Sequence, residues 1–247
     1  MDLKIAGKCA AVAGATKGLG FAAARSLAAE GVRVAICGRD EERLKRAVRG
    51  IVGDVTGIRK DVSTPAGAAE FVEEAIRQLG QVDILVPNAG GPAPGAPSTT
   101  SIEAYQEAVN LNLFSTIAMC NAAVPGMRER KWGRIAAITS HAVRQPSAFI
   151  AASVTARAGI TGYLKALSNE VARDGVTVNS VQPGAHATDR MKELGIDLDR
   201  MAQSIPLGFL GGAEEFGDIV AFMCSASSNF VTGTSVLVDG GAYPGLV

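Results

Sequence analysis

Short runs of apolar residues alternate along this chain with longer stretches that have helical periodicity. The runs are apolar at every position, which is typical of parallel strands whose sheet is covered by helices on both faces. The alternation predicts one α/β domain over residues 1–247, with a doubly wound sheet of seven parallel strands and right-handed crossovers. The expected strands are residues 8–13, 32–37, 57–60, 82–87, 134–139, 177–181 and 235–238, and the expected helices are residues 18–30, 41–48, 65–79, 102–129, 148–174, 191–204 and 214–225.

Composition narrows the partners that such a domain could have. The 24 Lys and Arg residues balance the 24 Asp and Glu residues, so no basic surface for nucleic acid or an anionic membrane is expected. The first five residues lack the basic start of a signal peptide, and no apolar run is long enough for a membrane span. These features predict a cytoplasmic protein with a small-molecule partner. No metal is expected, since the cysteines stand singly within apolar stretches as buried thiols: Cys9, Cys37, Cys120 and Cys224.

A glycine-rich turn joins the first expected strand to the first expected helix. Glycines at this place let the backbone turn tightly and approach a pyrophosphate, whose charge is met by the free amides at the helix start. The alternative is a bare tight turn, but the strand-turn-helix context at the front of a β-α chain favours a dinucleotide site. The turn comprises Gly14, Thr16, Lys17, Gly18, Leu19 and Gly20.

The end of the second expected strand bears on which dinucleotide is bound. Arg39 stands where an NAD site would normally present a carboxylate to the ribose 2′-hydroxyl. Its planar guanidinium suits a 2′-phosphate, and Lys17 could add a second cation at the same group. We therefore expect NADP(H) in preference to NAD(H). The carboxylate of Asp40 argues in the other direction, and both cations could instead be solvated surface charges.

These motifs, in this order and over nearly the whole chain, resemble the short-chain dehydrogenase/reductase family, in particular its branch of 3-oxoacyl-acyl-carrier-protein reductases. The resemblance implies a single-domain Rossmann fold, NADP(H)-dependent reduction of a ketone or oxoacyl group to an alcohol or the reverse, and a homo-oligomer, either tetramer or dimer. Beyond the glycine turn, it is carried by Asp61 and Val62 at the adenine, Asn88, Ala89 and Gly90 beside the cofactor, Pro183, Gly184 and Thr188 at the nicotinamide, and the carboxyl-terminal segments 232–233 and 238–241.

The resemblance also places four catalytic positions, two of which hold unexpected residues. In the family a Ser polarises the carbonyl, a Tyr is the acid or base, a Lys lowers the pKa of the Tyr and holds the ribose, and an Asn supports a water molecule. The spacing puts Ser140 at the Ser position and Asn112 at the Asn position. Ser153 then stands in place of the Tyr, and Arg157 stands in place of the Lys.

Ser153 and Arg157 are four residues apart on one expected helix, so both face the same point. Arg157 can donate hydrogen bonds to ribose hydroxyls, but it cannot lose a proton in a relay. Ser153, without an adjacent base, is a poor acid, because useful proton donors have a pKa near the operating pH. Ribose binding by Arg157 is therefore expected, and the family's usual proton transfer is not.

The chain has two histidines, and both fall beside the expected pocket. His141 follows Ser140 directly, and His186 lies close to the expected nicotinamide segment. Histidine titrates near neutral pH, so either side chain could donate the proton that a reduced carbonyl needs, although each could equally be a packing residue. Tyr243 is a further candidate, because the carboxyl-terminal tail could fold back over the pocket.

Three functions are compatible with these residues. The first is an NADP(H)-dependent reductase or dehydrogenase for a small-molecule carbonyl or alcohol. The second is a non-redox enzyme on the same scaffold, such as a lyase, an isomerase or a dehalogenase-like enzyme. The third is an inactive subunit that binds or senses NADPH. The segments expected to form the substrate pocket, 91–100 and 188–204, carry no charge cluster that would name the substrate.

Overall fold

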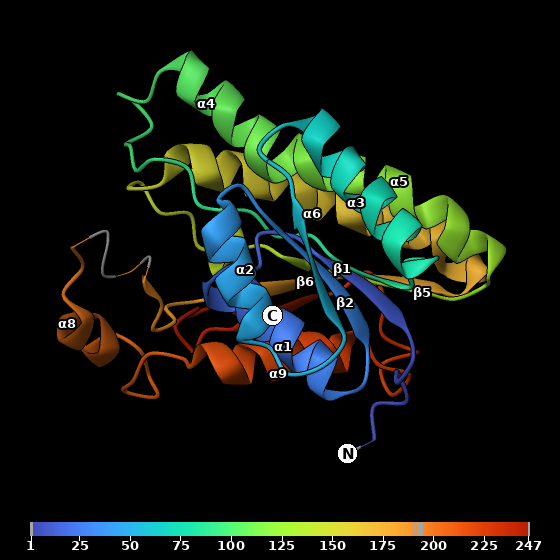
Figure 1. The fold of residues 1–247 in the computed structure, drawn as a ribbon. Coiled ribbons are helices and arrows are strands. Elements are labelled where there is room, and N and C mark those ends of the chain that lie inside the picture. Colours follow the sequence, from blue (N-terminus) through green and yellow to red (C-terminus); the bar gives the residue numbers. More distant parts are fainter. Residues whose placement is uncertain (1, 190, 192–194, 247) are drawn as a thin grey trace.

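The computed structural model describes residues 2–189, 191 and 195–246. Its centre is a parallel sheet of seven strands in the order β3-β2-β1-β4-β5-β6-β7, which confirms the predicted doubly wound architecture (Figure 1). The chain crosses from β3 on one edge, over β1, to β4, so the strand order reverses beside β1. The strands are β1 (Cys9–Val12), β2 (Arg33–Gly38), β3 (Val55–Arg59), β4 (Ile84–Val86), β5 (Gly133–Ile138), β6 (Val176–Pro183) and β7 (Ser235–Val238).

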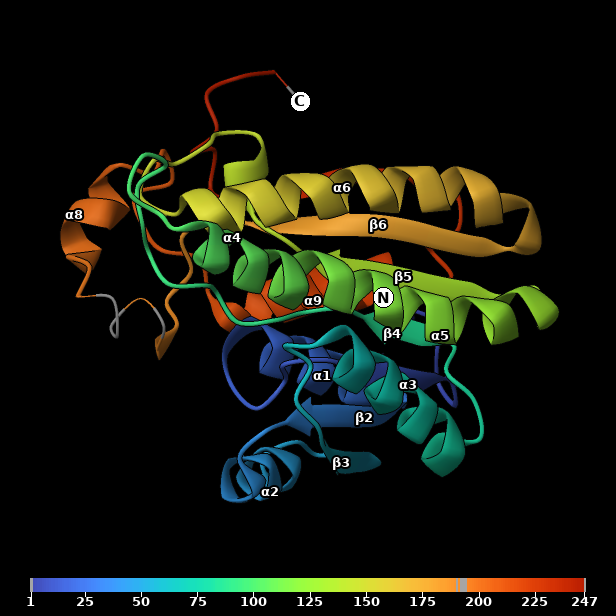
Figure 2. The same ribbon diagram turned by 90° about the horizontal axis from the view of Figure 1, so that it is seen from above.

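Helices cover both faces of the sheet. One face packs against α3, α5 and α6, and the other packs against α1 and α9 (Figure 1). The helix α8 lies apart from both layers at one side of the molecule (Figure 2). The helices are α1 (Gly18–Ala29), α2 (Glu41–Arg49), α3 (Pro65–Leu79), α4 (Ile102–Val109), α5 (Ser115–Glu129), α6 (Ala151–Val171), α8 (Leu198–Gln203) and α9 (Ala213–Met223).

Local chemistry fixes where these helices begin and end, and α3 shows it most fully. The side chain of Thr64 accepts a hydrogen bond from the amide of Gly67 and so caps the first turn. Pro65 occupies the first helical position, where its missing N–H costs nothing. Gly80 ends the helix with a φ of 87°, a conformation that favours glycine. The predicted bounds of this helix, 65–79, are those observed.

The predicted helix 102–129 is wrong in one respect. It is interrupted between α4 and α5 by a π-helical segment, Asn110–Phe114. The hydroxyls of Ser115 and Thr116, just after this segment, donate to the carbonyls of Leu111 and Asn112 within it. π-helical turns inside α-helices are frequent at functional sites.

Two other helices are shorter than predicted. The helix expected from residue 148 begins at Ala151, because Gly95 pairs with the chain just before it, donating to the Phe149 carbonyl and accepting from the Ala151 amide. In the helix expected over 191–204, α8 covers only Leu198–Gln203. Gly195 precedes it with a φ of 64°, which breaks the helical path, and residues 192–194 lie outside the described residues.

Buried thiols and polar groups do not form a metal site in the described part of the chain. All four cysteines are free and buried, as the sequence predicts. Over residues 2–189, 191 and 195–246 no group of three His, Cys, Asp or Glu side chains comes together at metal-binding distances.

In the same residues no helix combines the length and apolarity needed to cross a membrane.

Candidate functional site

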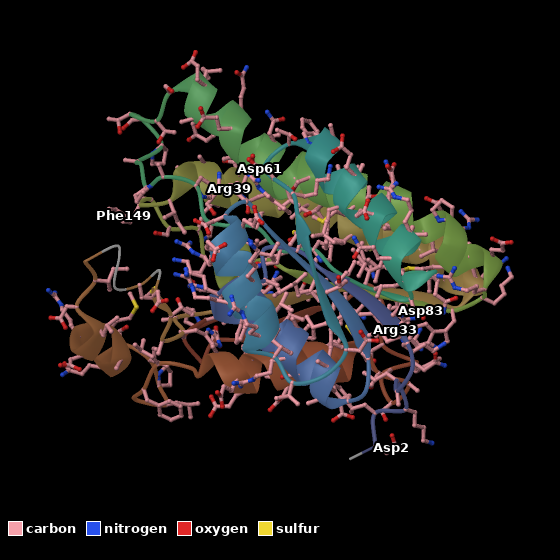
Figure 3. All side chains as sticks on the ribbon, in the orientation of Figure 1. Asp2, Arg33, Arg39, Asp61, Asp83 and Phe149 are labelled. Atoms are coloured by element: carbon pink, nitrogen blue, oxygen red, sulfur yellow. The ribbon has the colours of Figure 1, made fainter. Side chains whose placement is uncertain are left out.

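A cleft of about 700 Å³ opens at the carboxyl ends of the strands, beside β1, where the strand order reverses. Ligands of open parallel sheets bind at this kind of crevice. Arg39 and Asp61 lie at the carboxyl ends of the strands, whereas Arg33 and Asp83 lie at the amino ends (Figure 3). The cleft is lined by Gly14, Thr16, Lys17, Gly18, Leu19, Gly20, Cys37, Gly38, Arg39, Asp40, Arg43, Lys60, Asp61, Val62, Ser63, Asn88, Ala89, Gly90, Gly91, Leu111, Ile138, Thr139, Arg157, Pro183, Thr188 and Asp189.

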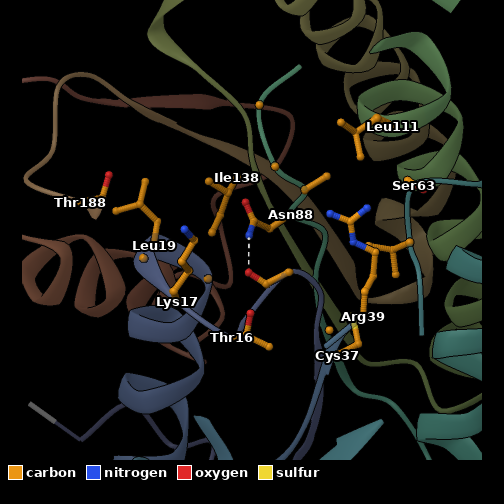
Figure 4. Close-up of a pocket in the computed structure, with 18 of the residues that line it drawn as sticks. Thr16, Lys17, Leu19, Cys37, Arg39, Ser63, Asn88, Leu111, Ile138 and Thr188 are labelled. Carbon is orange, nitrogen blue, oxygen red and sulfur yellow. Dashed lines mark hydrogen bonds between the residues drawn. The ribbon is translucent and has the colours of Figure 1, made fainter. Parts of the chain in front are cut away.

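The glycine turn forms the floor of the cleft and admits no side chains at its tightest points. The side-chain amide of Asn88 donates to the carbonyls of Ala13 and Gly14, at 3.2 and 3.1 Å. Figure 4 shows Asn88 pointing its amide at the turn. A Cβ at Gly20 would lie 2.6 Å from both Asn88 Nδ2 and the Gly14 carbonyl oxygen. A Cβ at Gly38 would lie 2.4 Å from the Thr16 methyl group. The bare backbone and the start of α1 therefore form a cradle that suits a phosphate group.

Cations cluster where the cleft passes the ends of β2 and β3. The side chain of Arg39 is three-quarters exposed, and its Nη1 lies 3.9 Å from Oδ2 of Asp61 (Figure 3). Arg43 and Lys60 also line this part of the cleft, and sequence reasoning missed both of them. Nothing in the sequence separates these two cations from ordinary surface charges. Lys17 lines the cleft from the glycine turn, as predicted.

Asp40 lines the cleft and also caps a helix. Its side chain accepts a hydrogen bond of 2.8 Å from the Arg43 amide and caps α2. This hydrogen bond holds the pKa of the Asp40 carboxyl below its usual range. The sequence carried a signal for this role, since an Asp directly before a helix that starts with two Glu residues is a typical N-cap.

Arg157 reaches the other end of the cleft from α6. Its Nη1 donates to the carbonyls of Ile138 and Thr139, at 3.2 and 2.8 Å, and its Nε donates to Ser153 Oγ at 3.3 Å. Burial lowers the pKa of the Arg157 guanidinium to about 10, so the side chain keeps its charge at neutral pH. The charge thus lies at the carboxyl end of β5, on the cleft wall.

Ser140, Ser153 and Asn112 are the other three residues at the expected catalytic positions. None of them is among the residues lining the cleft. Ser140 Oγ accepts a hydrogen bond from the Ala142 amide, so its own proton stays available for donation. Ser153 is buried on α6 and accepts from Arg157. Asn112 is 4% exposed, within the π-helical segment.

Comparisons with known proteins place this geometry in a family. The family model described as "Enoyl-(Acyl carrier protein) reductase" matches residues 14–243. The chain is 34% identical to the 3-oxoacyl-[acyl-carrier-protein] reductase FabG of Escherichia coli (strain K12), covering 96% of this chain and 98% of the relative. It is 35% identical to 3beta-hydroxysteroid dehydrogenase 1 of Eggerthella lenta, covering 99% and 97%. The chain belongs to the short-chain dehydrogenase/reductase family.

Solved structures of oxidoreductases share the whole fold. L-sorbose reductase from Gluconobacter frateurii, in complex with NADPH and L-sorbose, superposes with a TM-score of 0.93 at 30% identity, with both chains fully covered. YwfH, an NADPH-dependent reductase involved in bacilysin biosynthesis, gives a TM-score of 0.91 at 26% identity over 97% of this chain and 99% of that one.

In this short-chain dehydrogenase/reductase the cofactor residues expected from the motifs share one cleft, with one difference. Gly184 is absent from the lining, because it packs against the chain after β7: a Cβ there would lie 2.6 Å from the Cβ of Asp239. Pro183 and Thr188, on either side of it, do line the cleft.

The two histidines lie in different surroundings. His141 is half-buried in a 3-10 turn, His141–Val143, and its Nδ1 lies 3.2 Å from the Pro183 carbonyl oxygen. His186 is 4% exposed, with its ring centroid 5.1 Å from that of Phe216 on α9. Burial lowers the pKa of His186 and so disfavours the charged form of its ring. His186 therefore has the surroundings of a packing residue.

Other side chains near the site have structural explanations. The amide of Tyr243 donates to Asp239, and Tyr243 is not among the residues lining the cleft. Burial raises the pKa of the Cys37 thiol to about 12, so this thiol lines the cleft without being a nucleophile.

Proposed function

We propose that this short-chain dehydrogenase/reductase is an NADPH-dependent reductase that converts a ketone or oxoacyl group of a small molecule into an alcohol. The observation that carries the proposal is the cleft itself: a glycine turn that includes Lys17, and three further cations, Arg39, Arg43 and Lys60, beyond the ends of β2 and β3. The carboxylate at the end of β2, Asp40, lines the cleft but has one oxygen engaged in capping α2. The NADPH complex of L-sorbose reductase, 30% identical, supports the same choice of cofactor.

The residues present fit a phosphorylated dinucleotide. The amides at the start of α1 would hold the pyrophosphate, because no Cβ obstructs them. Arg39 and Arg43 would pair with the 2′-phosphate, and Asp61 and Val62 would lie beside the adenine. Arg157 would donate to the ribose nearest the nicotinamide, and Pro183 and Thr188 would contact the nicotinamide end. When bound, the nicotinamide supplies or accepts a hydride.

The chain's own groups act on the substrate oxygen. Ser140 would donate its hydroxyl proton as a hydrogen bond to the carbonyl, since its lone pair already accepts from Ala142. The fixed charge of Arg157 would stabilise negative charge that develops on the oxygen. Ser153 keeps the guanidinium oriented through its hydrogen bond, and Asn112 would support water from the π-helical segment.

The test is NADPH consumption. Purified protein is mixed with NADPH and a panel of a 3-oxoacyl thioester, a ketose, a cyclic ketone and a quinone. Loss of NADPH absorbance that depends on one of these carbonyls supports a reductase. Turnover of substrate without loss of NADPH would instead show a non-redox enzyme on this scaffold.

A second candidate function is NADPH binding without turnover. It is favoured by one observation: neither Ser153 nor Arg157 can release a proton near neutral pH. Tight NADPH binding with no oxidation on any carbonyl would support this candidate and contradict the reductase.

We also propose that the protein is a homo-oligomer that associates through its long helices. A groove of about 500 Å³ runs between α5 and α6. Light scattering on the purified protein should give a dimer or tetramer mass, and a monomer at every concentration would contradict this. The groove is lined by Asn121, Val124, Pro125, Arg128, Tyr163, Ala166, Leu167 and Glu170.

A further inference from the structure

The Pro183 carbonyl, at the end of β6, lies past the point where β5 stops pairing with this strand. Thr139 donates its amide to the Val181 carbonyl, so that carbonyl faces β5. In a parallel ladder every second residue bonds the same neighbour, so the Pro183 carbonyl also faces the β5 side. β5 ends at Ile138, and the chain has turned into the 3-10 segment by His141.

The imidazole of His141 takes the place of the missing amide. Its Nδ1 lies 3.2 Å from the Pro183 carbonyl oxygen. A carbonyl oxygen only accepts, so Nδ1 carries the hydrogen, and the titrating nitrogen is Nε2. This is the arrangement of a proton donor whose ring is oriented by a fixed acceptor.

His141 is not among the residues lining the cleft, but residues beside it and bonded to it are. Its hydrogen-bond partner, Pro183, lines the cleft, and so does Thr139, two residues before it. Ser140, which would bond the substrate carbonyl, is its neighbour in the chain. Arg157 holds the Thr139 carbonyl from the other side. His141 is thus one hydrogen bond away from the wall of the cleft at the place where a carbonyl would react.

We propose that His141 is the general acid that replaces the missing tyrosine, with its ring held by the Pro183 carbonyl. This inference rests on the proposed reductase function. With NADPH bound, the cofactor would supply a hydride to the carbonyl carbon, and Nε2 of the protonated imidazole would give one proton to the carbonyl oxygen, so that the C=O group becomes a C–H and an O–H bond. The neutral imidazole then takes a proton from water and restores the starting state.

Other ionisable groups surround this end of the sheet. Arg157 lies on α6, and Arg144, at the end of the same turn as His141, donates to Gln182. Asp189 and His186 follow β6, and Asp239 follows β7. Among these side chains, imidazole is the type that suits proton exchange near neutral pH.

Proton NMR gives a readout that does not depend on turnover. The two histidines give two ring signals, and the signal lost in His141→Asn assigns them. If the His141 ring lies beside the reacting end of the cleft, a nicotinamide bound there should change the surroundings of that ring. We expect the His141 ring signal to move when NADP⁺ or NADPH binds. A His141 signal that neither coenzyme moves, although both bind, would overturn the inference.

The His141→Asn variant also separates the acid from a merely structural role. The Asn amide nitrogen can still donate to the Pro183 carbonyl, but it cannot release a proton. General acid catalysis is worth about 10²- to 10⁴-fold, and we expect carbonyl reduction to fall in this range with NADPH affinity and melting temperature unchanged. In the wild type, reduction should fall as rising pH deprotonates the imidazole, and this decline should vanish in the variant.

Three outcomes of the kinetic test are distinguishable. A His141→Asn variant that reduces the carbonyl within about twofold of the wild type, a margin far below the typical acid contribution, would overturn the inference and leave the reductase proposal intact. A wild type that binds NADPH but reduces no carbonyl would contradict the reductase function and, with it, this role for His141. If neither NADP⁺ nor NADPH bound to the protein, both the reductase function and the role of His141 would be contradicted.

Discussion

At the scale of single residues, Arg157 is the side chain on which most of the site depends. It joins α6 to the end of β5 by bonding two main-chain carbonyls, and it still lines the cleft. A lysine at this place has one compact ammonium group, whereas the planar guanidinium can bond several acceptors at once. The Arg157 guanidinium therefore combines a positive charge on the cleft wall with a structural role.

Replacing Arg157 by Ala should weaken both the fold and the site. The carbonyls of Ile138 and Thr139 would lose their donor, which costs about 1–3 kcal/mol for a buried group left unpaired. The loss of a ribose partner should also raise the Kd for NADPH at least about tenfold. Urea unfolding and a fluorescence titration measure the two effects. An unchanged Kd in a folded variant would remove Arg157 from the cofactor site.

Arg39 should decide between the two coenzymes. A charge-assisted hydrogen bond is worth about 1.5–3 kcal/mol, so Arg39→Ala should raise the Kd for NADPH about 10- to 100-fold and leave that for NADH nearly unchanged. Arg46→Ala is the matched control, since Arg46 lies on α2 outside the cleft lining. If both coenzymes weakened equally, Arg39 would not be the 2′-phosphate ligand.

At the scale of elements, the strand-turn-helix unit of β1 and α1 positions the cofactor. Its glycines are needed for close approach, since Gly20 leaves no room for a Cβ beside Asn88 and the Gly14 carbonyl. Asn88, at the end of β4, ties that strand to the turn by two hydrogen bonds. The floor of the cleft is thus shared by two neighbouring strands.

The Gly20→Ala substitution should therefore disturb both packing and cofactor binding. Overpacking of this kind costs about 1–3 kcal/mol, and the displaced turn should weaken NADPH binding. Gly162→Ala is the control, because a Cβ there meets nothing within 4 Å and an alanine favours the helix. Differential scanning calorimetry with and without NADPH compares the melting temperatures of the two variants. A Gly20→Ala variant that binds NADPH as tightly as the wild type would show that the turn does not contact the cofactor.

The sequence predicts elements well where each has its own pattern. The continuous apolar strands and the glycine turn carry local signals, so the sheet and the floor of the cleft were predictable. The π-helical segment was not, because its residues keep helical periodicity on both sides. Arg43 and Lys60 were missed because a cation on an exposed surface shows its role only when the fold brings other cations beside it.

At the scale of the whole molecule, one buried imidazole should tie stability to pH. Burial lowers the pKa of His186, so the folded protein binds fewer protons than the unfolded chain below about pH 6.5, the usual midpoint of histidine. Stability should then be complete above that pH and should decline as the pH falls below it. Carboxylates with lowered pKa values act only below about pH 4.5, so the two effects occupy different windows.

Urea unfolding at about pH 7.5 and about pH 5.5 measures this dependence within the histidine window. The free energy of unfolding should be lower at the acid value. A free energy that does not change across this window would contradict a lowered pKa for the buried His186.

The central claim concerns the cleft as a whole: it holds a phosphorylated nicotinamide dinucleotide. Calorimetric titration of the purified protein with NADPH and, separately, with NADH tests this claim most directly. With Arg39, Arg43 and Lys60 beyond the ends of β2 and β3, and Lys17 in the glycine turn, NADPH should bind at least about tenfold more tightly than NADH. Absence of heat with either coenzyme, or tighter binding of NADH, would contradict it.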